Sequence, residues 1–194
     1  MLRTVFLVLL AATVAIAGGA GSVWYALGSQ EGIGAVNIGG WTAFPNIGTP
    51  DADPYSKARV AREGVLALGR AEGLTFIAQR DSAGARLTRT CSYVVQGATP
   101  PARFWTLYAA DDNLVELDTR RKRKPAVNSI GLLRAADNAF AIAISPSATP
   151  GNWLGIDGAG NFTVVLTLYD TPIASSSGID AVELPEVLKV GCDV

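Results

Sequence analysis

Residues 161–170 read NFTVVLTLYD, and this stretch decides the fold. Its side chains alternate between two faces, and one of the two faces is wholly apolar from residue 162 to residue 168. A period of two is typical of a β-strand, because successive side chains of a strand point to opposite sides of its sheet. The stretch therefore predicts a strand with one face on a core. The apolar face consists of Phe162, Val164, Leu166 and Leu168, and the opposite face of Thr163, Val165, Thr167 and Tyr169.

Other short segments with strand patterns lie on both sides of this one, with turn residues between them. They cover residues 75–80, 87–95, 104–110, 129–133, 139–145 and 187–192. The turn Asp137-Asn138 predicts a hairpin that joins 129–133 to 139–145. Many short strands at this spacing predict a mainly β fold, an antiparallel β-sandwich of the jelly-roll type.

Residues 51–73 carry a helical pattern instead. Asp53 is a typical N-cap residue, and Pro54 suits the first position of a helix. We expect one amphipathic helix that stops near Gly69 or Gly73 and packs its small apolar face on a sheet. That face consists of Ala58, Ala61, Val65 and Leu68.

An apolar segment begins the chain. No charged residue occurs between Arg3 and Glu31, and the 23 residues from Val5 to Leu27 are almost wholly apolar. A helix of about 20 apolar residues crosses a bilayer, and the basic residue before it favours a cytoplasmic N-terminus. The segment predicts an inner-membrane protein with a single span, N-terminus inside, and the domain in the periplasm or otherwise outside the cytoplasm.

A cleaved signal peptide is the alternative for this segment. Its apolar region would be Val5–Ile16, followed by Ala15-Ile16-Ala17 as the cleavage motif. Trp24 and Tyr25 favour the uncleaved anchor, since aromatic residues settle at the membrane interface. In both interpretations the rest of the chain is exported from the cytoplasm. The predicted organisation is an anchor at residues 1–27, a linker rich in Gly, Asn and Pro at 28–50, and one domain at 51–194.

The composition excludes several kinds of site. The chain has no histidine, which excludes a Ser-His-Asp triad and metal sites built on imidazole. Its net charge of −1 gives no basic field for nucleic acid. We expect no metal and no cofactor. The carboxylates form no recognisable catalytic pair, so a carboxylate-based hydrolase is an alternative to a non-catalytic module.

Two cysteines, Cys91 and Cys192, are present. Cysteines of exported proteins commonly pair, so we expect a disulfide that closes a loop of about 100 residues. The bond would clamp the final strand to the core. Two buried free thiols are the alternative.

A run of five basic residues, Arg120–Lys124, lies between predicted strands and ends at Pro125. A solvated loop is the simplest interpretation. The run could also contact anionic lipid headgroups, or hold an acidic ligand or partner.

Tryptophan occurs beside polar side chains in two segments. PARFWTLYAAD at Pro101–Asp111 contains Arg103 and Trp105, and PGNWLG at Pro150–Gly155 contains Asn152 and Trp153. Two rings with an arginine and an amide could line a pocket for a sugar or a small anionic molecule. The alternative is a structural role, with the rings in the core, Arg103 paired with an aspartate and Asn152 shaping a turn.

These two segments also occur with four others in a fixed order, namely DPYSKARVA, CSYVVQG, VLTLYDTP and the late Leu184-Pro185. In this order they resemble a bacterial family known as domain of unknown function 1214, over about residues 41–193. The resemblance implies antiparallel β architecture and a companion domain of unknown function, numbered 1254, which is not visible in this chain. It implies no established enzymatic activity. The chain departs from the family pattern at Gly155, where many members have proline, and at Thr167, where many have arginine.

We therefore expect a membrane-anchored envelope module that binds a small molecule, a glycan or a partner protein, without catalysis. The companion of the 1254 type is the candidate partner that the resemblance implies. The alternatives are a carboxylate-based hydrolase and a purely structural accessory subunit with an apolar surface patch.

Overall fold

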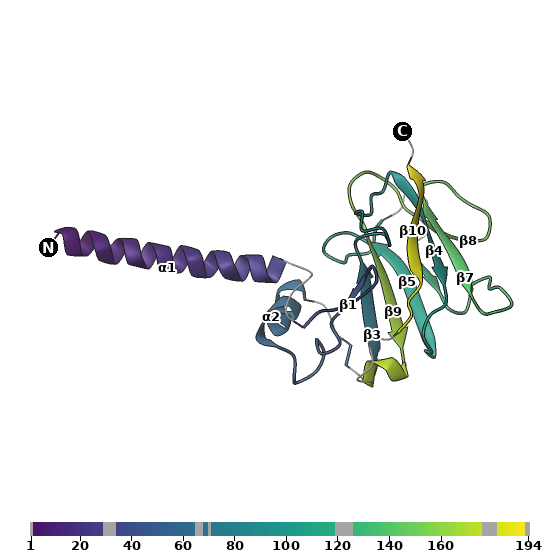
Figure 1. Ribbon diagram of the computed structural model, residues 1–194, viewed down its shortest axis with the longest axis horizontal. Helices are drawn as coiled ribbons and strands as arrows, with labels where there is room; N and C mark the ends of the chain where they lie inside the picture. Colours follow the sequence, from purple (N-terminus) through teal and green to yellow (C-terminus); the bar gives the residue numbers. More distant parts are fainter. Residues whose placement is uncertain are drawn as a thin grey trace.

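The computed structural model describes residues 2–28, 34–64, 68–69, 71–118, 126–175 and 182–192. In these residues ten strands form two sheets (Figure 1). The larger sheet has the order β1 (Val36–Ile38), β2 (Trp41–Ala43), β3 (Gly73–Ala78), β9 (Thr163–Tyr169), β5 (Phe104–Ala110), β6 (Ala126–Asn128). The smaller sheet has the order β10 (Glu186–Cys192), β4 (Cys91–Gly97), β7 (Phe140–Ser145), β8 (Asn152–Gly155). The predicted mainly β fold is confirmed.

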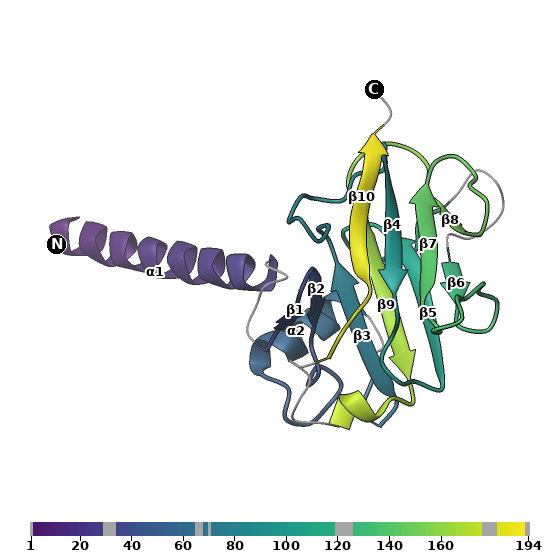
Figure 2. The same cartoon turned by 45° about the vertical axis from the view of Figure 1, so that its right-hand side comes forward.

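The two sheets lie face to face, with the smaller one in front of β3, β9 and β5 in Figure 2. Aromatic side chains join them across the core. The ring centroids of Trp105 on β5 and Phe140 on β7 lie 5.1 Å apart, and those of Tyr93 and Phe162 lie 5.6 Å apart. Such ring pairs bury large apolar areas and add about 0.5–1.5 kcal/mol each beyond that burial. The sandwich is therefore held by contacts between the sheets.

Strand β9 lies at the centre of the larger sheet, between β3 and β5. The predicted apolar face is confirmed, because Phe162, Val164, Leu166 and Leu168 are all buried in the core. The opposite face is also buried at Thr163, Val165 and Thr167. On this face the Thr167 hydroxyl lies 3.2 Å from the hydroxyl of Thr75 on the neighbouring strand β3.

Two strand pairings differ from the sequence-based expectation. The pair β7–β8 is parallel, whereas every other pair in the sheets is antiparallel. The predicted hairpin of 129–133 with 139–145 is wrong, because β6 is Ala126–Asn128 and pairs with β5. The Asn128 side chain accepts hydrogen bonds from the backbone N–H groups of Ile130 and Gly131. This local turn ends the strand and leaves residues 129–138 as a loop.

Part of the predicted linker belongs to the larger sheet. Residues 36–43 form β1 and β2, and β2 pairs with β3. Trp41 is buried, and its Nε1 donates to the carbonyl of Pro185 at 2.7 Å. This bond ties β2, the second strand of the larger sheet, to the segment that enters β10, an edge strand of the smaller sheet. A short 3-10 turn, η1 (Pro172–Ser175), follows β9.

The helix α2 (Pro54–Glu63) begins as predicted. Asp53 caps it by accepting from the N–H groups of Tyr55 and Ser56, and Gly64 ends it in the left-handed conformation, with φ of 63°. The predicted packing face is wrong, because Ala58 and Ala61 are exposed. Leu68 lies beyond the helix, and Val65 lies outside the described residues. The stop at Gly64 shortens the helix and leaves Ser56 as its buried side chain.

The helix α1 (Leu2–Gly28) projects away from the strands (Figure 1). Within it, Leu2–Tyr25 is long and apolar enough to cross a membrane, and none of its most hydrophobic window is buried by the rest of the protein. A membrane anchor and a signal sequence both have these properties.

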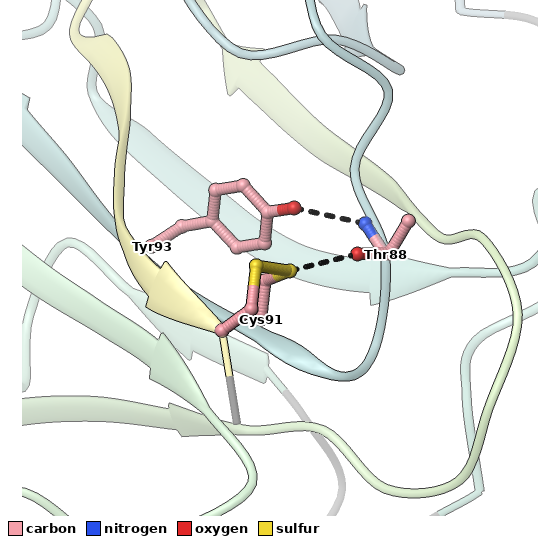
Figure 3. The surroundings of a disulfide bond; sticks show 4 residues. Thr88, Cys91 and Tyr93 are labelled. Atoms are coloured by element: carbon pink, nitrogen blue, oxygen red, sulfur yellow. Dashed lines mark hydrogen bonds between the residues drawn. A yellow bond between two sulfur atoms is a disulfide. The ribbon is translucent and has the colours of Figure 1, made fainter. Parts of the chain in front are cut away.

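The predicted disulfide between Cys91 and Cys192 is confirmed (Figure 3). The two residues are directly opposite each other where β4 pairs with β10. The Thr88 hydroxyl donates to Cys91 Sγ at 3.1 Å, and the Tyr93 hydroxyl accepts from the Thr88 backbone N–H at 3.0 Å. The bond fixes the last described residue of β10 to the core strand β4. It also agrees with an oxidising compartment outside the cytoplasm.

Candidate functional site

A groove of about 1600 Å³ runs over the outer face of the smaller sheet. Its floor consists of side chains that point away from the core: Val94 and Gln96 on β4, and Ala141 and Ala143 on β7. They point outward because they alternate with inward residues that fill the sandwich, Tyr93, Val95, Ile142 and Ile144. The two small alanines keep the floor low, so the groove is open and shallow.

The two sides of the groove carry opposite charge. On the β8 side it is lined by Asn152 and Arg134, and on the β10 side by Glu183 and Glu186. Strands β8 and β10 are the opposite edges of a four-stranded sheet. Three strand spacings separate them, which is about 14 Å. An extended chain of about four residues spans that distance.

The rim on the open end of β4 comes from residues 97–101. Gly97 has φ of +126°, and a Cβ added to it would lie 3.4 Å from Cα of Pro185. Glycine suits this position because it adopts a positive φ without strain.

Asn152 is the predicted site residue that lines the groove. Its amide is fully engaged with the loop 129–138 and with β7. Oδ1 accepts from the N–H of Leu133 at 2.8 Å, while Nδ2 donates to the carbonyls of Leu133 at 2.8 Å and Ala141 at 3.0 Å. Asn152 therefore holds the loop in place beside the groove.

Arg134 follows Leu133 in that loop and was not expected from the sequence. Its guanidinium lies 5.7 Å from the ring centroids of both Trp105 and Phe140. Cations are attracted to the negative face of an aromatic ring, so the two rings fix the guanidinium at the edge of the core. No sequence motif marks this residue, because its ring partners lie about 30 residues before it and six residues after it.

The other three predicted site residues lie outside the groove lining. Trp105 is buried between the sheets. Trp153 donates from Nε1 to the backbone oxygen of Ser145 at 3.2 Å and to its hydroxyl at 3.1 Å. Arg103 is exposed and pairs with Asp170 at 3.0 Å. The four residues are not brought together in one pocket, and a ligand-binding role for them stays a prediction.

Among the described residues, Asp53 and Tyr108 have clearly shifted pKa values, and both lie outside the groove lining. The hydrogen bond from the Ser56 hydroxyl lowers the pKa of Asp53, while burial raises the pKa of Tyr108. Within the part of the chain that the structure describes, no group of three His, Cys, Asp or Glu residues could hold a metal ion. The basic run Arg120–Lys124 lies outside the described residues, so its three interpretations stay open.

Comparison with known proteins gives a family and a fold. Residues 72–173, more than half of the chain, match the family described as "Protein of unknown function (DUF1214)". No curated protein matches. The solved structure of the VPA0106 protein from Vibrio parahaemolyticus is similar, with a TM-score of 0.56 and 20% identity. The match covers 72% of this chain and 36% of that one, so this chain spans about a third of the length of that protein.

An uncharacterised protein from Burkholderia cenocepacia aligns with a TM-score of 0.38 and 16% identity, over 75% of this chain and 44% of that one. The similarity to the Vibrio structure is one of fold. The family match lies within the predicted range of residues 41–193 and contains the segments around Trp105 and Trp153. The chain belongs to the DUF1214 family of proteins of unknown function.

Proposed function

We propose that this protein is a membrane-anchored module whose domain lies outside the cytoplasm, in the bacterial envelope, and binds an extended polypeptide without catalysis. The apolar helix α1 supports the tether, and the disulfide supports the oxidising compartment. The orientation with the N-terminus inside follows from Arg3, which precedes the apolar segment.

The groove is the observation that carries the binding function. Its volume of about 1600 Å³ exceeds the range of roughly 300–1,000 Å³ that is usual for small-molecule sites. Its floor of Val94, Gln96, Ala141 and Ala143 is mostly made of small side chains and contains no aromatic ring. An extended backbone fits such a surface, with its side chains contacting the charged groups on either side.

A separate envelope protein with the companion domain of the 1254 type is the partner that the family resemblance suggests. Opposite charges at Arg134 and Glu186 favour a polypeptide that carries an acidic group toward β8 and a basic group toward β10. The carboxylate-based hydrolase remains the second candidate, since Glu183 and Glu186 place two carboxyl groups on one side of the groove.

Site-specific photo-crosslinking in the native membrane tests the proposal. A photoreactive residue replaces Ala141, which is exposed in the groove, and in a control replaces Val115, which is 62% exposed elsewhere. We expect a discrete polypeptide adduct at position 141 and none at 115. Equal labelling at the two positions, or labelling of neither, would contradict a polypeptide-binding groove.

The hydrolase alternative gives a different result in the same protein. The double variant Glu183→Gln with Glu186→Gln should reduce crosslinking at position 141, because it removes the charge that faces the partner. A hydrolase would instead trap uncleaved partner and increase the adduct. Mass spectrometry of the adduct distinguishes an intact partner from a fragment.

A further inference from the structure

Arg134 is a half-buried cation, and its side chain contacts uncharged groups throughout the described part of the chain. Nη1 donates to the backbone oxygen of Asn138 at 3.2 Å and to its side-chain oxygen at 3.3 Å. Nη2 lies 3.4 Å from the backbone oxygen of Ser129. The remaining contacts are the rings of Trp105 and Phe140.

No carboxylate pairs with this guanidinium in the described part of the chain. Ion pairs form elsewhere, between Arg86 and Asp112 and between Arg103 and Asp170. The Arg134 Nε also has no acceptor among the described residues. A guanidinium has five N–H donors in a planar fork, and a carboxylate is the acceptor that fits this fork best. Arg134 thus has both a positive charge without a counter-charge and spare donors.

The position of Arg134 is fixed before any ligand arrives. The preceding residue, Leu133, is held at both its N–H and its carbonyl by Asn152. The guanidinium is held at the rings by their negative faces. A cation that is ordered in advance loses little conformational entropy on binding, so an anion gains more from pairing with it.

We propose that Arg134 is the anchor for a carboxylate of the polypeptide that occupies the groove. This inference rests on the proposed function and adds the chemistry of the occupant. The carboxylate lies at the β8 side, and a basic group about 14 Å away faces Glu183 and Glu186. An acidic side chain and a free C-terminus both supply this carboxylate.

Fluorescence anisotropy on the full-length protein in lipid nanodiscs measures the preference. The first probe is acetyl-Asp-Ala-Ala-Ala-Lys-amide, and its matched control has Asn in place of Asp. The second is Lys-Ala-Ala-Ala-Ala with a free C-terminus, and its control is the C-terminal amide. Peptides of about five residues match the width of the groove. We expect the carboxylate form of at least one pair to bind about tenfold more tightly than its control.

Three variants test whether Arg134 causes the tighter binding of the carboxylate peptides. Arg134→Gln should abolish it, and Arg134→Lys should retain only part of it, since lysine keeps the charge without the fork. Arg86→Gln is the matched control, because Arg86 is an exposed arginine outside the groove, and it should leave the preference intact. Unfolding by urea reports whether each variant is folded.

The outcomes separate the two proposals. If Arg134→Gln keeps the tenfold preference, or if wild type binds both members of each pair equally, Arg134 is not the anchor. Crosslinking of the control peptides, which lack the carboxylate, at position 141 would then show that the groove still binds polypeptide. If no peptide binds and position 141 captures nothing in the membrane, both proposals fail.

Discussion

At the scale of single residues, Asp53 shows how one side chain defines an element. Its carboxylate accepts from the N–H groups of Tyr55 and Ser56 and from the Ser56 hydroxyl at 2.5 Å. These bonds favour the ionised form, and the Ser56 hydroxyl has the largest effect in lowering the pKa of Asp53 below 3.8. Because the folded-state pKa is depressed, the stabilisation is complete above the unfolded pKa. It is lost as the pH falls through the folded value.

We expect Asp53→Ala to destabilise α2 by about 1 kcal/mol at neutral pH, as loss of an N-cap does elsewhere. The difference from wild type should shrink as the pH falls below 3.8, because protonation weakens the wild-type cap. Hydrogen exchange of the α2 amides, normalised for the intrinsic rate at each pH, measures the effect. A difference that does not change with pH would show that the charge of Asp53 has no part in the cap.

Asn152 is the second residue-scale case. Asn152→Ala removes three hydrogen bonds to Leu133 and Ala141, and because Leu133 is exposed, water replaces part of them. We expect a loss of about 1–2 kcal/mol in the free energy of unfolding by urea, with faster exchange in the loop 129–138. Asn113→Ala, in an exposed turn, serves as the control and should stay within about 0.5 kcal/mol of wild type. An equal effect of the two variants on the free energy of unfolding would contradict the role of Asn152 in holding the loop 129–138 in place.

At the scale of elements, strand β10 is held in place mainly by contacts at its two ends. Its start is tied to β2 by the bond from Trp41 to Pro185, and its end to β4 by the disulfide. Between them the ladder shifts register from Lys189 to Gly191, and Val190 is 70% exposed. A bulge on an edge strand discourages pairing with other chains but also weakens the ladder. The disulfide therefore matters most for the last part of the strand.

The double variant Cys91→Ser with Cys192→Ser tests this. We expect it to lose about 2–4 kcal/mol of unfolding free energy, since the bond closes a loop of 101 residues. Exchange at residues 189–192 should accelerate more than exchange at 186–188, which lie next to Pro185. The control is wild-type protein whose disulfide has been reduced in the presence of urea, because it lacks the bond without the change from cysteine to serine. A uniform acceleration along β10 would mean that the bulge does not divide the strand.

At the scale of the whole molecule, α1 projects from the domain and is not covered by it (Figure 1). An anchor keeps the groove close to the membrane, so an occupant would also be found there. We expect the intact mass of the protein from its native membrane to include the whole of α1. Loss of the first ~17–20 residues would establish a cleaved signal peptide instead, because signal regions run about 15–30 residues. Export of the domain would be unchanged.

The sequence by itself determined the class of fold, the core face of β9, the strand Phe104–Ala110, the cap at Asp53, the pairing of Cys91 with Cys192 and the family. These depend on local periodicity, on the preferences of single residues, or on motifs in a fixed order. Alternation of apolar and polar side chains can be recognised in the sequence because it depends only on strand geometry. The helix face at Ala58 and Ala61 was wrong because a local pattern does not reveal what covers it.

Only the tertiary structure decided where the groove lies. Arg134 and Asn152 lie on one side of the groove and Glu183 on the other, and pairing of β7 with both β4 and β8 brings their elements together. Trp105, the most conspicuous candidate in the sequence, is in the core, while the small side chains of Ala141 and Ala143 form the floor. A binding surface depends on which strands are neighbours and which side chains are left uncovered. Both are settled by long-range packing, which local sequence patterns do not encode.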